Sequence, residues 1–361
     1  MAQFVKLNPQ ELKELRTVNE RLISYNVEMT EVTGGTFWKA YTDAQIDGTE
    51  DVPPPDFTKG MAAMHQWYDP IDTTNPRLIK LAKELGSAWV RVSGTWATKT
   101  YYDFEGTGEV PEGYQNRLTK EQWINLLNFV KAVDGKLLIS VANCEGLHSA
   151  DEPWNPSQAE KIFALSTECG VPINAVEFTN EPNMMEMTGF PKGYTPAHFR
   201  RDQDLFHKWV RENYPDCLIV GPCTCDAEAL SGGKKESSGG AGIADVMPSC
   251  TTGDLLDGCT EKLDVFSYHY YNGISERMAA MMPSMYTPAS QATSEAYLGM
   301  AGMCARAFVP YRDKYCPNGE MWVTESGDAG GGGDTWASTY LDVLRTLNEL
   351  GGFSALTRGI I

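Results

Sequence analysis

Short apolar runs and longer amphipathic stretches alternate along most of the chain. Short runs rich in β-branched and aromatic residues are typical of buried strands, whereas apolar residues spaced by three and four positions are typical of helices that face a core. The pattern predicts strands at residues 21–29, 87–93, 136–142, 175–179, 217–222, 263–268 and 320–324. It predicts helices at residues 75–85, 119–133, 156–169, 196–214, 294–315 and 335–350.

Strands in regular alternation with helices predict the α/β class and a (β/α)8 TIM barrel rather than an antiparallel fold. The eighth strand departs from this rhythm, because only residues 351–361 follow the last predicted helix. Residues 352–356 could begin that strand, and a barrel that did not close would expose sheet edges. We therefore expect residues 1–361 to form one catalytic barrel that ends at or near its eighth strand, as a truncated chain would, with no C-terminal β-sandwich evident.

Two features of the predicted loops bear on a binding site. Residues 231–242 are low in complexity and rich in Gly and Ser, which predicts a surface loop at the carboxyl ends of the strands, with a mobile lid as the sharper alternative. Trp38, Trp67 and Trp96 lie near predicted loops. Each could stack on a sugar face, although core packing is the more common role of a single tryptophan.

The balance of charge limits the partners that this chain can have. It carries 30 basic and 48 acidic residues, for a net charge of −18. Nucleic acid and anionic membranes attract basic surfaces, so neither is an expected partner. A long sulfated polysaccharide would also be repelled unless a local basic patch exists. No signal-peptide core or membrane-length apolar run occurs, so a cytosolic protein and a secreted protein that has lost its leader both remain open.

The nine cysteines do not form a recognisable framework. An odd number scattered through a long chain is not typical of a disulfide scaffold. Cys223 and Cys225 are the closest pair, but they lack the spacing of a zinc site and no second Cys/His pair accompanies them. The sequence therefore predicts mostly reduced, buried thiols. No metal and no cofactor is expected, since dinucleotide and phosphate-loop fingerprints are also missing.

Two predicted strands lead into a glutamate that chain-breaking residues follow. Glu181 ends the strand at residues 175–179, and Glu325 ends the strand at residues 320–324. The active site of an α/β barrel lies at the carboxyl ends of its strands, so these side chains are expected to face each other. Two carboxylates across a cleft are the minimal equipment for glycoside hydrolysis. A lone strand-end glutamate is more often a solvated or capping residue, but Asn180 adds an amide that can bind a sugar hydroxyl.

The Asn-Glu-Pro sequence at residues 180–182, together with a second glutamate after a later strand, resembles the clan of retaining glycosidases built on (β/α)8 barrels. Within that clan, three stretches resemble glycoside hydrolase family 79, the family of heparanase and microbial β-glucuronidases. They are residues 90–95, 268–273 and 325–334. The resemblance runs from about residue 20 to the end of the sequence, and the glycine run after Glu325 is its most family-specific part.

The resemblance implies a role for each matching residue. Glu181 would be the acid/base and Glu325 the nucleophile of a retaining mechanism. The other matched positions would contact the sugar, and they are Glu28, Thr95, Asn180, His269, Tyr271, Gly331 and Gly332. Within this set Asn180 would bind the 2-hydroxyl, whereas His269 and Tyr271 would lie beside the nucleophile.

The glycine run is implied to receive the carboxylate of a uronic acid on the N–H groups of Gly331 and Gly332. Consecutive glycines let the backbone turn its N–H groups inward as an anion-binding nest, although a plain flexible loop is an equal alternative. Two positions depart from the family pattern. Glu28 stands where heparanase has an aspartate, and Gly330 stands where the family often has a tyrosine that also holds the carboxylate.

These observations predict a retaining, exo-acting β-glucuronidase that cleaves terminal β-linked glucuronic acid through a covalent glycosyl-enzyme. An endo-β-glucuronidase that acts on glycosaminoglycan is an alternative with the same chemistry, which the net charge disfavours. A non-catalytic carbohydrate-binding remnant of a glycosidase is the alternative of a different class. The incomplete eighth strand motivates that alternative, but the presence of both glutamates counts against it.

Overall fold

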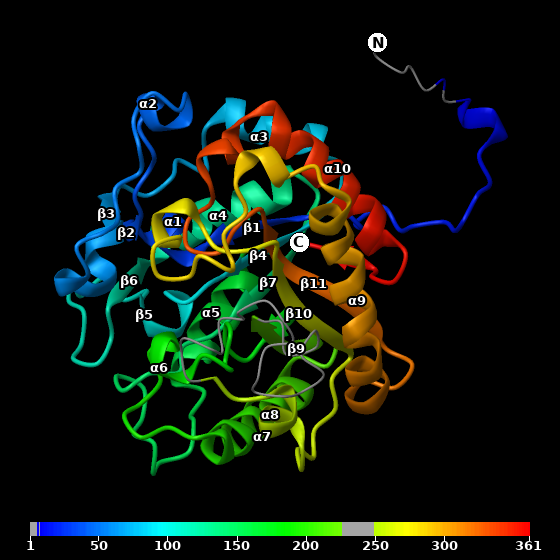
Figure 1. The fold of residues 1–361 in the computed structure, drawn as a ribbon. Coiled ribbons are helices and arrows are strands. Elements are labelled where there is room, and N and C mark those ends of the chain that lie inside the picture. The colour runs from blue at the N-terminus through cyan, green and yellow to red at the C-terminus, as the bar shows by residue number, and fades with distance from the viewer. Residues whose placement is uncertain (1–5, 7, 226–248) are drawn as a thin grey trace.

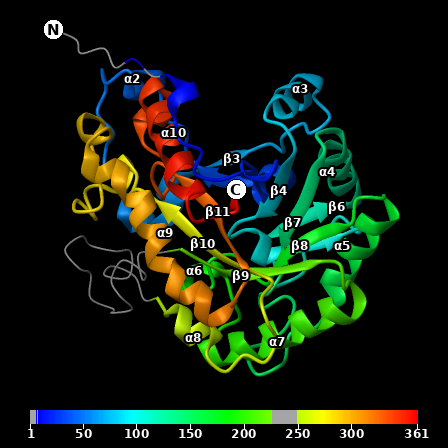
Figure 2. The same cartoon turned by 90° about the vertical axis from the view of Figure 1, so that its right-hand side faces the viewer.

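A computed structural model of the chain describes residues 6, 8–225 and 249–361. Eight parallel strands form one sheet that curls into a barrel, and helices surround it (Figures 1 and 2). In order around the sheet the strands are β1 (Tyr25–Glu28), β4 (Ala88–Ser93), β7 (Gly135–Ser140), β8 (Ile173–Glu177), β9 (Leu218–Cys225), β10 (Val265–Tyr271), β11 (Glu320–Gly327) and β12 (Gly359–Ile360). This arrangement confirms the predicted (β/α)8 class.

The outer helices are those that the apolar periodicity predicts, with small shifts at their ends. They are α3 (Pro76–Glu84), α4 (Lys120–Ala132), α5 (Ser157–Glu168), α7 (Pro196–Asn213), α9 (Glu295–Tyr315) and α10 (Tyr340–Ser354). Capping residues fix several of their starts. Thr119 forms the predicted capping box with Gln122 at the start of α4. Among the described residues, no helix combines the length and the apolar character that crossing a membrane requires.

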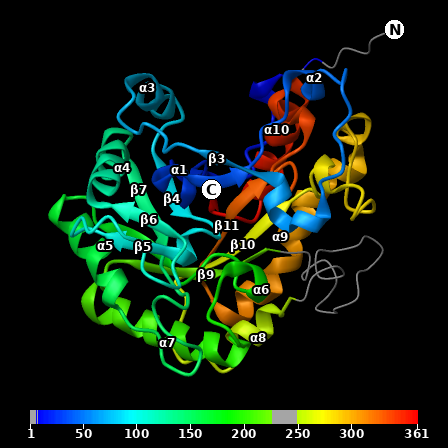
Figure 3. The same cartoon turned by 90° about the vertical axis from the view of Figure 1, so that its left-hand side faces the viewer.

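Shorter elements decorate the loops at the carboxyl ends of the strands, and Figure 3 shows the β5–β6 pair beside α5. They are α1 (Met29–Thr33), β2 (Gly35–Trp38), α2 (Asp43–Ile46), β3 (His65–Tyr68), β5 (Thr100–Asp103), β6 (Asn116–Thr119), α6 (Met185–Thr188) and α8 (Thr252–Leu256). The 3-10 helices are Pro9–Glu11, Phe57–Met64, Ala97–Lys99, Glu276–Met278, Ala289–Gln291 and Thr335–Ser338. The predicted loop at residues 231–242 lies outside the described residues.

A short eighth strand closes the barrel. Ile360 of β12 pairs with Val323 of β11 on one side and bridges to Ile23, just before β1, on the other. Above this point, the Asn26 Nδ2 group donates a hydrogen bond of 3.1 Å to the carbonyl of Thr324, which joins β1 to β11 directly. The ring of strands is therefore continuous although β12 is only two residues long.

Two expectations about the strands are wrong. Residues 352–356 do not begin the eighth strand, because α10 continues to Ser354 and the strand lies at Gly359–Ile360. The apolar signal there came from Phe353, a helix residue that packs against Tyr270 in the core. Glu181 does not end the fourth barrel strand either, since β8 stops at Glu177.

The interior of the barrel is layered. Its lower layer is an apolar cluster formed by Trp89, Leu138, Ala175, Val220, Val265 and Trp322. Side chains alternate along a strand, so residues two positions further on line the same interior one layer higher. That upper layer is polar and buried, and it includes Arg91, Ser140, Glu177, Ser267 and Thr324. The polar groups of the interior therefore gather toward the carboxyl ends of the strands, which we call the barrel mouth.

Candidate active site

A buried arginine in β4 organises the barrel mouth. Arg91 is 1% exposed. Its guanidinium donates to Glu177 Oε2 at 2.9 Å and to Glu325 Oε2 at 3.1 Å. It also donates to Asn26 Oδ1 at 2.7 Å and to Asn180 Oδ1 at 2.8 Å. These acceptors offset the cost of burying the charge, which would be several kcal/mol if Arg91 were unpaired.

Bulges on both sides of β10 set the direction of the side chains at the mouth. The pairing of β10 with β11 skips Thr324 and so places Glu325 directly opposite His269. The pairing of β10 with β9 skips Cys223 at nearly the same level. A bulge inserts one residue into a strand and turns the following side chains to a new direction. The bulge at Thr324 therefore positions Glu325 beside His269.

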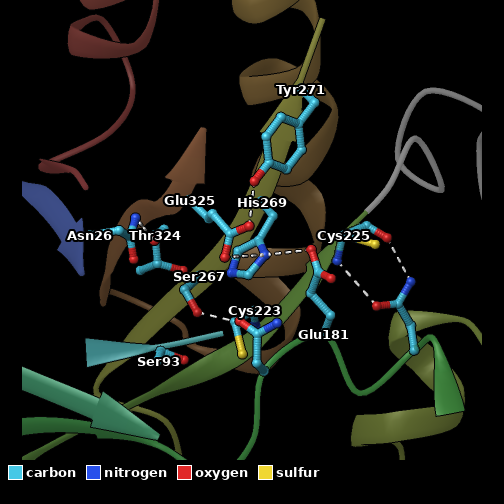
Figure 4. A network of polar contacts seen from close by, with 12 residues as sticks. Asn26, Ser93, Glu181, Cys223, Cys225, Ser267, His269, Tyr271, Thr324 and Glu325 are labelled. Carbon is cyan, nitrogen blue, oxygen red and sulfur yellow. Dashed lines mark hydrogen bonds and ion pairs between the residues drawn. The ribbon is translucent and has the colours of Figure 1, made fainter. Parts of the chain in front are cut away.

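His269 lies between the two predicted catalytic glutamates (Figure 4). Its Nδ1 atom is 2.9 Å from Glu181 Oε1 and 3.6 Å from Glu325 Oε2. Its Nε2 atom is 3.3 Å from Arg91 Nη2. A guanidinium can only donate, so Nε2 accepts and the ring proton of the neutral imidazole sits on Nδ1. His269 therefore donates a hydrogen bond to Glu181 and fixes the position of that carboxyl group.

The two glutamates come close together although 144 residues separate them in sequence. One oxygen of Glu181, one oxygen of Glu325 and a ring nitrogen of His269 all lie within 4.8 Å of one another. The glutamate side chains are 19% and 20% exposed, whereas His269 is buried. The structure thus brings the predicted pair together at the mouth, with both carboxyl groups accessible from outside.

The same three side chains have donor atoms that could hold a divalent cation, as do Glu177, Cys223 and His269 below them. Arg91 contacts both groups of donors, through Glu177 and through His269. The positive charge of its guanidinium opposes a second cation at this place. The arrangement is therefore better suited to proton transfer between paired carboxyl groups than to metal binding.

The environment of Glu325 favours its ionised form. Burial alone would raise the pKa of this carboxyl group, but the charge of Arg91 and the hydrogen bonds that Glu325 accepts outweigh burial and lower it. The hydroxyl of Tyr271 also donates to Glu325 Oε1 and stabilises the carboxylate. Burial first, and then the charge of Glu325, holds the pKa of Tyr271 well above its ordinary value. Tyr271 therefore stays a hydrogen-bond donor to Glu325 at neutral pH.

Glu28, at the end of β1, has the opposite character. Burial, and then the charge of Glu325, raises the pKa of Glu28 well above its ordinary value. Its Oε1 atom is buried and has no hydrogen-bond partner among the described residues. Gly94 leaves room for it, since a Cβ there would lie 1.6 Å from Oε1. Burial thus favours the protonated form of Glu28, whose O–H group could donate to a ligand. Thr95 follows at the same edge and is partly exposed.

The glycine run after Glu325 packs against Tyr271. A Cβ added at Gly330 would lie 3.8 Å from the ring of Tyr271. Gly331 and Gly332 adopt positive φ angles of 83° and 94°, which glycine tolerates without strain. Their N–H groups donate to no other described residue. The run therefore begins beside Tyr271, whereas Gly331 and Gly332 approach Met278 and Trp38, and the N–H groups of these two glycines are free of described partners.

Asn180 differs in one respect from the role that the resemblance implies. It is buried, and its Oδ1 atom is occupied by Arg91. The side-chain amide is thereby oriented, because an amide has one oxygen and one nitrogen end. Its Nδ2 end makes no hydrogen bond with another described residue and is the end available to a sugar hydroxyl. Arg91 thus fixes the direction in which Asn180 can bind.

Sequence reasoning assigned no role to Arg91 and Glu177, which join the site. Both are charged residues inside otherwise apolar strands, β4 and β8. Full burial of a charge is rare unless a partner of opposite sign is present, so two such charges in one barrel indicate an internal ion pair. Their separation of 2.8 Å fits that rule. The two charged residues in apolar strands were visible in the sequence, but the sequence did not show that they pair with each other.

The chain is similar to known proteins in sequence and in fold. No protein-family model matches it. It is similar to a protein named hyaluronoglucuronidase from Hirudo nipponia, with 24% identity over 314 residues. That match covers 78% of this chain and 57% of the relative, so the chain spans somewhat more than half the length of the relative that it matches.

Solved structures of glycosidases share the fold at low sequence identity. A GH51 arabinofuranosidase from Xanthomonas axonopodis pv. citri superposes with a TM-score of 0.57 and 14% identity, covering 95% of this chain and 66% of that one. A 4-O-α-L-rhamnosyl-β-D-glucuronidase from Fusarium oxysporum 12S superposes with a TM-score of 0.51 and 12% identity, covering 95% and 62%. These similarities show that the chain has the barrel fold of glycosidases.

Proposed function

We propose that this chain is a retaining, exo-acting glycoside hydrolase that releases terminal β-linked glucuronic acid. The observation that carries the proposal is the approach of Glu181 and Glu325, whose nearest oxygens lie within 4.8 Å around His269. Retaining enzymes hold their two carboxyl groups about 5–5.5 Å apart, whereas inverting enzymes need about 6.5–9.5 Å to admit a water molecule. The short separation therefore supports retention.

The environments of the two glutamates divide the roles between them. Glu325 is held ionised by Arg91 and Tyr271, as a nucleophile requires. It attacks the anomeric carbon and forms a covalent glycosyl-enzyme. Glu181 donates a proton to the leaving oxygen in this step, and it removes a proton from water in the next. His269 keeps Glu181 in place for both transfers, because its Nδ1–H donates to Glu181 Oε1.

Donors around this pair are suited to an acidic sugar. Asn180 offers an amide for the 2-hydroxyl, a contact that strengthens in the transition state. Glu28 offers an O–H group, and Gly331 and Gly332 offer backbone N–H groups to a carboxylate. A glucuronide is further supported by the names of two similar proteins, a hyaluronoglucuronidase and a rhamnosyl-glucuronidase.

The test is hydrolysis of p-nitrophenyl β-glucuronide beside the β-glucoside, β-xyloside and β-galactoside. We expect cleavage of the glucuronide with retention, read by NMR of the first-formed anomer. Glu325→Gln should lower turnover by at least about 10⁴-fold and leave the unfolding temperature unchanged. Glu320→Gln on the exposed end of the same strand is the matched control. Near-normal turnover in Glu325→Gln would show that the nucleophile is wrongly assigned.

An endo-acting enzyme on hyaluronan chains is the second candidate, favoured by the name of the Hirudo nipponia relative. Net charge opposes it, since a polyanion needs basic groups along its path and this chain carries −18. Size analysis of products from a long hyaluronan chain separates the two candidates. Release of monosaccharide supports exo action, whereas a rapid fall in chain length supports endo action.

A further inference from the structure

The glycine run is held from behind by hydrogen bonds to its carbonyl groups. The carbonyl of Gly330 accepts from the Ser275 N–H at 2.9 Å, and that of Gly331 accepts from the Ser275 hydroxyl at 2.8 Å. A peptide group is planar and trans, so its N–H points opposite to its C=O. The N–H groups of Gly331 and Gly332 therefore both point away from Ser275. Their common direction is set by contacts within the protein before any ligand binds.

Arg277 continues this support along the run. Its side chain donates to the carbonyl of Gly332 at 3.3 Å, to the Tyr41 hydroxyl at 3.2 Å and to the carbonyl of Lys39 at 2.9 Å. The guanidinium carbon also lies 4.2 Å from the centre of the Tyr41 ring. The Tyr41 hydroxyl in turn donates to the carbonyl of Gly333 at 2.8 Å. Arg277 thus joins the loop after β2 to the glycine run.

Arg277 differs from the other buried arginines in the charge of its partners. Arg91, Arg277 and Arg345 are 1%, 7% and 6% exposed. Arg91 and Arg345 each form ion pairs with two carboxylates. Arg277 contacts two carbonyls and a hydroxyl, and no described carboxylate pairs with it. A buried charge without a counter-charge is costly, so this cation is suited to an anion that comes from outside the protein.

Both basic and acidic groups surround Arg277. Burial first, and then the charges of Arg277, Lys99 and Lys39, lower the pKa of His65. The acids of this region are Glu276, Asp328 and, directly after the glycine run, Asp334. Burial and the neighbouring acids raise the pKa of Asp334 to about 7, and the charge of Arg277 offsets this in part. Arg277 is therefore a cation that faces these acids and contacts the glycine run directly.

We propose that Arg277 determines specificity for the carboxylate of the glucuronyl ring. It acts from behind the glycine run, where its guanidinium holds the carbonyl of Gly332 and supplies a positive charge. This inference rests on the proposed function and names the residue that selects the acidic sugar.

The test compares kcat/KM for p-nitrophenyl β-glucuronide and β-glucoside in Arg277→Met and Arg277→Lys. We expect Arg277→Met to lower the glucuronide-to-glucoside ratio about tenfold, mainly through KM for the glucuronide, because a nearby charge is lost in a partly buried site. Arg277→Lys keeps the charge and should retain most of the ratio. Arg306→Met on the exposed face of α9 is the control and should leave the ratio unchanged.

An unchanged ratio in Arg277→Met overturns the inference, and so does an equal loss on both substrates with a lower unfolding temperature. The wild-type protein reports on the proposed function separately, since a preference for the glucoside would refute both. If the wild type cleaves neither substrate, calorimetric binding of glucuronate, with glucose as reference, replaces the ratio. Loss of glucuronate binding in Arg277→Met then supports the inference, and equal binding, or none by the wild type, overturns it.

Discussion

The lower apolar layer of the barrel interior, which we call the floor, and the barrel mouth are lined by side chains of the same strands, two residues apart. Trp89 and Trp322 pack in the apolar floor with ring centres 4.9 Å apart. Arg91, one inward position above Trp89, belongs to the network that contains Glu325 and His269. Alternation along a strand determines which side chains face the barrel interior. The position along the strand then determines whether such a side chain packs in the apolar layer or belongs to the polar site. Charges are tolerated where they contact one another above a packed floor.

Substitution of Arg91 is the strongest test of this difference between floor and mouth, because Arg91 is as buried as the floor residues but forms ion pairs as the mouth residues do. Arg91→Met should destabilise the protein by about 3–5 kcal/mol, since it leaves the Glu177 carboxylate buried without its partner. Turnover should also be lost, because Glu325 and Asn180 lose the donor that positions them. Urea unfolding and the aryl-glucuronide assay measure the two effects.

The double variant Arg91→Met/Glu177→Gln separates these effects. Removing the buried charge together with its partner should recover much of the stability but none of the turnover. Arg312→Met, in an exposed pair with Asp313, is the control and should change little. A stable and fully active Arg91→Met would show that the mouth does not depend on this network.

Glu181 sharpens the comparison on the side of the mouth. Glu181→Gln should slow cleavage of an alkyl glucuronide by about 10²–10⁴-fold, because a poor leaving group needs the proton of a general acid. An aryl glucuronide with a good leaving group should lose less in its first step. Initial rates on both substrates measure the contrast, with Glu186→Gln on exposed α6 as control. An equal loss on both substrates would contradict the role of Glu181 as the acid.

Trp322 sharpens the comparison on the side of the floor. Trp322→Ala should cost about 3–5 kcal/mol of unfolding free energy, since it removes a large side chain that is 3% exposed and leaves a cavity. The protein that remains folded should keep its pH profile and its preference among aryl glycosides. Leu138→Ala makes the same test with a smaller cost of about 2–5 kcal/mol if the first variant does not fold. A changed substrate preference would show that floor and mouth are coupled.

The smallest expected effect is a dependence of stability and of KM on pH, which comes from the ionisation of Asp334. Burial first, and then the charges of Asp328 and Glu276, raise the pKa of Asp334 to about 7, and Arg277 offsets this only in part. Since the pKa is raised on folding, the contribution to stability is complete below the unfolded value of about 4 and is lost as pH rises through about 7. The unfolding temperature should fall over this range in the wild type.

Asp334→Asn should flatten this dependence, because the amide keeps an oxygen for the Glu276 N–H but does not ionise. Ionised Asp334 would also repel a bound carboxylate, so KM for the glucuronide should rise above pH 7 in the wild type and less in the variant. Thermal unfolding and kinetics from pH 5 to pH 8 check both effects, with Asp313→Asn as an exposed control. Parallel profiles for wild type and Asp334→Asn would mean that another group titrates.

Much of the fold and the reactive pair follow from local patterns in the sequence. Short apolar runs predicted seven barrel strands, and the 3.6-residue spacing of apolar residues predicted their helices, whereas the eighth strand was misplaced. Phe353 misled that prediction, because an apolar helix residue near a chain end looks like a strand residue when only its neighbours are considered. The position of Glu181 and Glu325 beyond apolar runs predicted that they meet, since parallel strands end on one side of a barrel.

Contacts between distant segments decided the remainder. Residues far apart in sequence determine three features of the site. They determine which donor holds Glu325 ionised, which nitrogen of His269 carries its proton and which atoms orient the glycine run. Arg91 and Arg277 are both buried arginines, and only the structure shows that Arg91 pairs with carboxylates whereas no described carboxylate pairs with Arg277. The sequence determined the barrel and its two glutamates because periodicity and strand ends are local properties. Tertiary structure alone decided protonation and orientation, because hydrogen bonds and electric fields depend on distance in space.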